Sequence, residues 1–71
     1  MKYLAIIERG PRSYGAYVPD LPGCVAAGKT PREVRRLIRE AIQLHVADLR
    51  KRGLPVPKPR TAGEVVVLKV A

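Results

Sequence analysis

The residues best spaced for chemistry are four arginines in one stretch of the chain: Arg32, Arg35, Arg36 and Arg39. If this stretch is helical, at about 100° per residue, their side chains gather on one flank, where they can follow a nucleic-acid backbone. The chain carries a formal net charge of +8 in 71 residues, which favours anionic partners. The alternative interpretation is a solvated helix face, because aromatic side chains that could stack on bases are scarce.

A second candidate is a thiol–imidazole pair of Cys24 and His45, with Asp48 one helical turn further on to orient the ring. Cys24, however, lies among small apolar residues, where a cysteine usually serves packing. His45 falls near the centre of an apolar helical arc. We therefore predict no catalytic residue and no enzyme.

The carboxylates are too dispersed for metal chemistry. A two-metal nuclease needs several acids that converge on ions about 4 Å apart, and residues 65–70 contain none. The glycines do not form a phosphate-binding motif. A single cysteine excludes an intramolecular disulfide and a multi-cysteine metal site. We expect no metal and no cofactor.

Four strands and one helix should position these residues. Hydrophobic patterning predicts strands at 2–8, 14–18, 25–27 and 64–70, and a helix at 31–52. The fold class is α+β, in the order β-β-β-α-β, with an antiparallel, hairpin-based sheet and one helix packed on it. A strand–helix–strand return of this length permits the last strand to lie beside the first.

The ends and the buried face of the helix are marked in the sequence. Thr30 suits the N-cap, Pro31 the first helical position, and Glu33 the third position of a capping box. Gly53 stands where a left-handed C-terminal cap is expected. The predicted apolar arc consists of Val34, Leu37, Ile38, Ala41, Ile42, His45 and Leu49.

The first strand is apolar on both faces, which indicates a protein-contact surface. Rigid apolar and aromatic residues follow it, and Asp20 is suited to accept hydrogen bonds from the backbone amides just after it. The predicted partner-binding residues are Tyr14, Tyr17, Pro19, Asp20, Leu21 and Pro22. A small aliphatic core without Phe or Trp also favours a homo-oligomer, dimeric or larger.

Composition places the chain as a single domain, residues 1–71, in the cytoplasm. There is no signal-peptide pattern and no apolar run near the roughly 20 residues that span a membrane, so no membrane partner is expected. Seven prolines and few thermolabile residues are typical of a thermophile.

The run PDLPGCVAAGKTPREV, followed by IREAIQLHVADLRKRGLPVPKP, resembles the HicB antitoxin family, and the resemblance extends from about Tyr3 to Val70. The positions that match the family motif are Pro19, Asp20, Leu21, Pro22, Gly23, Cys24, Gly28, Thr30, Glu33, Gly53, Pro55 and Pro57. The resemblance implies a degraded ribonuclease-H-like β-β-β-α-β domain without nuclease activity. No family catalytic residue is carried over to this chain.

The resemblance also implies a function. Members of the family are the antitoxin halves of toxin–antitoxin pairs, and they bind and block HicA, a small RNA-cleaving toxin that is commonly basic. This chain resembles a stand-alone N-terminal domain without the C-terminal DNA-binding domain. The predicted function is a non-catalytic antitoxin that binds and inhibits a small HicA-like ribonuclease toxin. The alternatives are a small basic RNA- or DNA-binding module that uses the arginine flank, and a residual nuclease.

Overall fold

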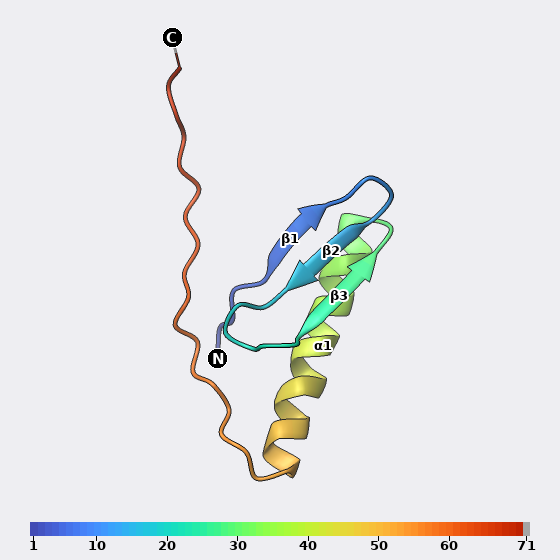
Figure 1. The fold of residues 1–71 in the computed structure, drawn as a ribbon, viewed down its shortest axis with the longest axis vertical. Helices are drawn as coiled ribbons and strands as arrows, with labels where there is room; N and C mark the ends of the chain where they lie inside the picture. The colour runs from blue at the N-terminus through green and yellow to red at the C-terminus, as the bar shows by residue number, and fades with distance from the viewer. Residues whose placement is uncertain (71) are drawn as a thin grey trace.

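A computed structural model describes residues 1–70, and they form a three-stranded antiparallel sheet crossed on one face by a long helix (Figure 1). The strands lie in the order β1-β2-β3. Their bounds are β1 Ile6–Arg9, β2 Tyr14–Tyr17 and β3 Val25–Gly28, and the helix α1 is Pro31–Lys51. No helix in this part of the chain is both long and apolar enough to cross a membrane.

The register of the sheet separates an inner from an outer row of side chains. Ile7 pairs with Ala16, and Ala16 pairs with Ala26. Ala16 is in the buried core, so this row faces α1. Because successive side chains on a strand point to opposite faces, the adjacent row of Ile6, Tyr17 and Val25 faces away from the helix.

The loop between β2 and β3 consists of two consecutive turns. The Leu21 amide donates to the Val18 carbonyl at 3.1 Å, and the Cys24 amide donates to the Leu21 carbonyl at 3.0 Å. Pro22 and Gly23, whose φ is +84°, occupy the two central positions of the second turn, as a type II turn requires. The loop thereby directs Leu21 into the core, where its side chain is completely buried.

Both ends of α1 have the predicted caps. The Thr30 hydroxyl accepts a hydrogen bond from the Glu33 amide at 3.0 Å. At the other end Gly53 has φ +70°, its amide donates to the Arg50 carbonyl, and the Leu54 amide donates to the Leu49 carbonyl. This pair of bonds is a Schellman motif, which ends the helix and turns the chain back.

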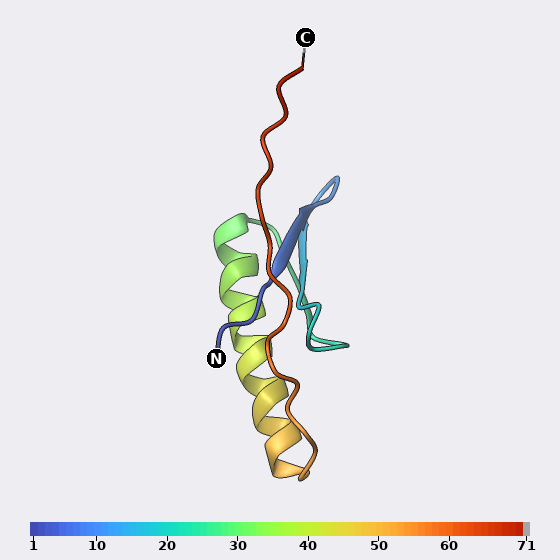
Figure 2. The ribbon, with the colours of Figure 1, turned by 90° about the vertical axis from the view of Figure 1, so that its left-hand side faces the viewer.

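The core is small and aliphatic. It lies between α1 and the sheet, and its buried residues are Ala16, Val18, Leu21, Cys24, Val34 and Ile38. The rest of the predicted helical arc is half-buried around Val34 and Ile38. The helix packs mainly against β3 and β2 and least against β1, and its C-terminal half extends past the sheet (Figures 1 and 2). The β1 side of the sheet is therefore the less covered side.

The α+β class and the order of three strands and a helix are confirmed, but the fifth element requires a correction. The sequence predicts a strand at residues 64–70, in a topology that permits it to lie beside the first. These residues are extended (Figure 1), yet they pair with no strand of the sheet. The chain is held at Pro57 by Tyr3 of the N-terminal segment and at Arg60 and Thr61 by the loop between β2 and β3, and it then runs away from the sheet (Figures 1 and 2). The first strand also begins later than predicted, at Ile6 rather than at residue 2, and the helix ends at Lys51.

Candidate protein-binding surfaces

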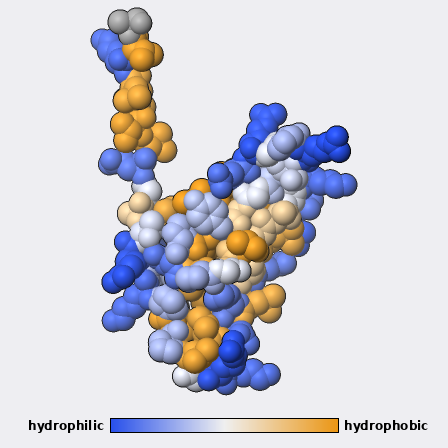
Figure 3. Space-filling view, in the orientation of Figure 1, coloured by the Kyte–Doolittle hydropathy of each residue, from blue (hydrophilic) through white to orange (hydrophobic). Residues whose placement is uncertain are grey.

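The outer face of the sheet is the first candidate surface. The side chains of Ile6, Tyr17 and Val25 form a cross-strand row on it, and Tyr17 and Val25 are 39% and 64% exposed. Figure 3 shows hydrophobic residues gathered over the sheet on this side, between hydrophilic margins. An exposed apolar row around a tyrosine, with a polar rim, is typical of the centre of a protein interface.

The structure divides the six residues that the sequence predicts to bind a partner. Tyr14 packs against the core on the α1 side, and Tyr17 points to the outer face. The Leu21 side chain is completely buried and can act only by shaping the loop. Pro22 is exposed and Pro19 is half-buried in the loop that borders the outer face. Tyr17 and Pro22 are thus the members of the set best exposed to a partner.

Asp20 has a different role from the one predicted. Its carboxylate accepts hydrogen bonds from the amides of Arg60 and Thr61, at 2.8 and 2.9 Å, and from the Thr61 hydroxyl at 2.6 Å, rather than from the amides that follow it. The Thr61 hydroxyl bond, followed by the two amide bonds and the Arg60 charge, holds the pKa of the Asp20 carboxyl below its usual value. We call this cluster of Asp20, Arg60 and Thr61 the Asp20 clamp. It fixes the start of the C-terminal segment to the loop between β2 and β3.

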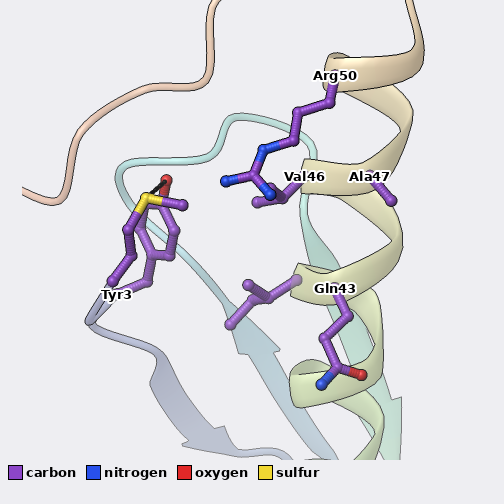
Figure 4. Close-up of a pocket in the computed structure, with 7 residues that line it drawn as sticks. Tyr3, Gln43, Val46, Ala47 and Arg50 are labelled. Carbon is purple, nitrogen blue, oxygen red and sulfur yellow. Dashed lines mark hydrogen bonds between the residues drawn. The ribbon is translucent and has the colours of Figure 1, made fainter.

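A second candidate surface is the groove between α1 and residues 1–7, which comprise the N-terminal segment and the start of β1. Two adjoining hollows of about 320 and 360 Å³ share Tyr3, Ile42 and Gln43 as lining residues, so they form one continuous groove. The rest of its lining is mostly apolar and comprises Met1, Ala5, Ile7, Ile38, Val46 and Ala47, with Arg35, Arg39 and Arg50 at the rim. Figure 4 shows Tyr3 of the N-terminal segment opposite Val46 and Arg50 of α1. We refer to it as the β1–α1 groove.

The arginine flank is present on α1 but is not uniform. Arg36 forms an ion pair with Glu40 at 3.2 Å, whereas Arg35 and Arg39 stand at the rim of the β1–α1 groove. Arg32 is exposed near the N-terminus of the helix. The four side chains therefore present a basic strip next to an apolar groove, rather than an isolated basic face.

Cys24, which the sequence assigns to packing rather than to a thiol–imidazole pair with His45, lies in the core. Cys24 is buried, and desolvation raises the pKa of its thiol, so the thiolate nucleophile is disfavoured. Its environment is the core cluster around Val34 and Leu21. Within residues 1–70, no group of three or more His, Cys, Asp or Glu side chains is arranged to hold a metal ion.

Comparison of the sequence and the fold with known proteins identifies the family of this chain. The model of the family described as "HicB_like antitoxin of bacterial toxin-antitoxin system" matches residues 3–68. The chain belongs to the HicB-like antitoxin family. Its motif residues, seen in the structure, build the β2–β3 loop, the Asp20 clamp and the caps of α1.

Individual relatives extend the match over the chain. A UPF0150 protein of Thermoplasma acidophilum is 38% identical over 68 residues, which cover 94% of this chain and 97% of the relative. A UPF0150 protein of Helicobacter pylori is 49% identical over 45 residues, which cover 63% of this chain and 62% of the relative. Among solved structures, a chain of the "HicA3 and HicB3 toxin-antitoxin complex" is similar with a TM-score of 0.73 and 30% identity, over 84% of this chain and 70% of that chain.

Sequence reasoning missed two features of this HicB-like chain. The β1–α1 groove joins residues from the N-terminus and the middle of the helix, and no local pattern signals such a contact. The Asp20 clamp joins residues 40 apart in the sequence. Thr61 is the one residue whose type could have indicated the clamp, because it places a hydroxyl donor for a carboxylate just after the proline-rich connector.

Proposed function

We propose that this HicB-like protein is a non-catalytic antitoxin that binds and inhibits a small HicA-like ribonuclease toxin. The observation that carries the proposal is the similarity, over 84% of the chain, to a chain of the HicA3 and HicB3 toxin–antitoxin complex. The family match over residues 3–68 supports the same role. The burial of the Cys24 side chain in the core supports a role without thiol chemistry.

The outer face of the sheet is the contact surface that we propose for the toxin. It offers Tyr17 and Val25 as exposed anchors, and the exposed Pro22 lies in the loop at its border. The loop is held by two turns and by the Asp20 clamp, so little conformational entropy is lost when it is docked. Inhibition then results from steric coverage of the toxin's active site.

Net charge gives this proposal a distinctive signature. A chain at +8 is repelled at long range by a basic toxin, and added salt screens that repulsion. We therefore expect association with a basic toxin to become faster as salt is raised from about 0.05 to about 0.3 M, provided that the contact is apolar. Binding that is driven by the arginines and an acidic partner would weaken instead.

The test is RNA cleavage by the HicA-like toxin of the same organism, titrated with the purified protein. Tyr17→Glu and Val25→Glu should each raise the concentration needed for half-inhibition by about tenfold or more, because a charge would be buried at the contact. Leu44→Glu is the matched control, since Leu44 is 72% exposed on α1 and away from the outer face. Undiminished toxin cleavage at saturating wild-type protein would refute the proposal.

The second candidate is binding of RNA or DNA by the arginine flank. It is favoured by Arg32, Arg35 and Arg39, which are exposed and form no ion pair among the residues that the structure describes. The double substitution Arg35→Glu and Arg39→Glu should abolish retardation of RNA in a gel at low salt, and Arg50→Glu on the same helix should reduce it less. A wild-type protein that retards neither RNA nor DNA would exclude this function.

A further inference from the structure

The feature that the proposed function leaves unexplained is the C-terminal segment, residues 64–70. It contains five aliphatic residues, and Val65, Leu68 and Val70 are 93%, 78% and 88% exposed. Figure 3 shows it as a hydrophobic arm that projects away from the body. Aliphatic side chains in an extended, unpaired segment leave both apolar surface and backbone hydrogen-bonding groups in water, so the segment has the composition of a strand without its neighbours.

The body of the protein fixes where this segment starts. The Tyr3 hydroxyl donates to the Pro57 carbonyl, and the Asp20 clamp holds Arg60 and Thr61. Gly63 lies against Leu4, since a methyl group at Gly63 would be 3.3 Å from Leu4 Cδ1. Beyond this point the segment runs away from the sheet (Figures 1 and 2). It is therefore anchored at its root and unpaired over its length.

The same chain carries a vacant place for a strand of this kind. Within residues 1–70 β1 pairs with β2 alone, and the β1–α1 groove, which reaches β1 at Ile7, is open and mostly apolar. Tyr3 and Leu4 already contact Pro57 and Gly63 of their own chain, so the edge that is open to a further strand comprises Ala5 and β1. Alternation puts Val66, Leu68 and Val70 on one face of the segment and Val65 and Val67 on the other, so either face can cover apolar residues of the groove.

We propose that residues 64–70 of one copy add as a fourth strand along β1 of a second copy, and that the exchange is reciprocal, which gives a closed dimer. Each segment fills the partner's β1–α1 groove and pairs with the free edge of β1. The arrangement is isologous, so it ends at two copies instead of growing into a chain.

A second copy fits the geometry better than the segment's own edge. Only residues 62 and 63 separate the clamped Thr61 from the start of the segment, and the segment already points away from its own β1. A partner's edge can receive the segment in its present extended form. Within one domain, a strand–helix–strand return permits the last strand to lie beside the first. The exchange makes the same contact between the last segment of one copy and the first strand of the other. It needs no toxin, so it stands or falls independently of toxin inhibition.

The first experiment measures the molar mass of the full-length protein by light scattering over a range of concentrations. We expect a dimer, and Leu68→Asp should raise the dimer dissociation constant by about a hundredfold, because each dimer buries two copies of residue 68. Leu44→Asp is the matched control, since Leu44 is similarly exposed but lies on α1, and it should leave the mass unchanged. A wild-type monomer at hundreds of micromolar would overturn the proposal.

The second experiment identifies what the segment pairs with. In a Cys24→Ala background, one chain carries Leu68→Cys and a separately tagged chain carries Ile7→Cys, with Ala5→Cys as a substitute if the latter misfolds. A disulfide between the two different chains after mixing supports the exchange. A third chain carries both cysteines, and a disulfide within that single chain would overturn the exchange. Disulfide-linked dimers of the Leu68→Cys chain alone would indicate that two segments pair with each other and would overturn it too. The absence of a disulfide in every mixture would also overturn it.

Discussion

The helix–sheet body and the C-terminal segment contain the same kinds of side chain in opposite environments. Val34 on α1 is completely buried, whereas Val65 is 93% exposed, and the fully buried Leu21 contrasts with Leu68 in the same way. The body can bury its aliphatic residues because the β2–β3 loop and the two helix caps bring three strands and a helix around one small core. Among residues 1–70 no layer packs over the segment, whose aliphatic side chains stay exposed. The contrast shows that aliphatic composition indicates which segments favour burial. Whether such a segment is buried within its own chain depends on which strands and helices pack beside it.

The strongest way to break this comparison is to truncate one leucine in each region. Leu21→Ala should lower the free energy of unfolding by about 2–5 kcal/mol, because it opens a cavity in a small core. Leu68→Ala, measured in urea at concentrations where the protein is monomeric, should change it by less than about 0.5 kcal/mol. If Leu21→Ala does not fold, Ile38→Val tests the same core with a smaller expected loss of unfolding free energy, about 0.5–1.5 kcal/mol. Equal losses for Leu21→Ala and Leu68→Ala would mean that the monomer already buries the segment.

The comparison is sharpened by two threonine hydroxyls: that of Thr30 accepts a hydrogen bond from the Glu33 amide in the body, and that of Thr61 donates one to Asp20 at the root of the segment. Thr30→Ala removes the N-cap of α1 and should lower the free energy of unfolding by about 1 kcal/mol. Thr61→Ala removes a bond of the Asp20 clamp and should leave global unfolding nearly unchanged, while it speeds protease cleavage near residue 61. A Thr61→Ala loss as large as that of Thr30→Ala would show that the clamp belongs to the cooperative core.

Acidification should release the root of the segment and spare the helix end. Because the Asp20 pKa is lower in the folded protein than in the unfolded chain, the clamp contributes fully above about pH 4 and is lost as the pH falls through the depressed pKa. The NMR amide shifts of Arg60 and Thr61 should therefore titrate in this acidic range, and Asp20→Asn should abolish that titration. The amides of Gly53 and Leu54, which donate to backbone carbonyls, are the internal control and should not follow it.

Local signals in the sequence were sufficient for the body. Thr30, Pro31 and Gly53 predicted the ends of the helix within one residue, and the Pro22-Gly23 pair marked a rigid turn whose geometry the structure confirms. β2 and β3 were predicted within one residue at each end, because turn residues bound both short runs. β1 begins four residues later than predicted, and residues 64–70 form no strand of the sheet. The HicB resemblance is confirmed by the family match.

Long-range pairing was beyond these signals. A run such as Val65–Val66–Val67 indicates a strand, but the identity of its neighbour depends on backbone geometry at residues 57–63. Asp20 reads as a turn residue in sequence, and its actual partners follow only once the chain has returned from the end of α1. Strand alternation is a local signal, so it predicted that Tyr14 and Tyr17 lie on opposite faces of the sheet. The Asp20 clamp depends on a contact between distant residues, so no local signal predicted it.

The proline-rich connector has a consequence for how far strand pairing can spread. An exposed seven-residue segment that contains four valines and a leucine, such as residues 64–70, is of the kind that nucleates cross-β stacking. Here Pro55, Pro57 and Pro59 precede it at every second position, and each removes a backbone donor. Lys58 and Arg60 between and after them, and Lys69 within the run, add like charges that would stack in register. Because the prolines cannot donate to a ladder, we expect any intermolecular strand pairing to stay within residues that follow the connector.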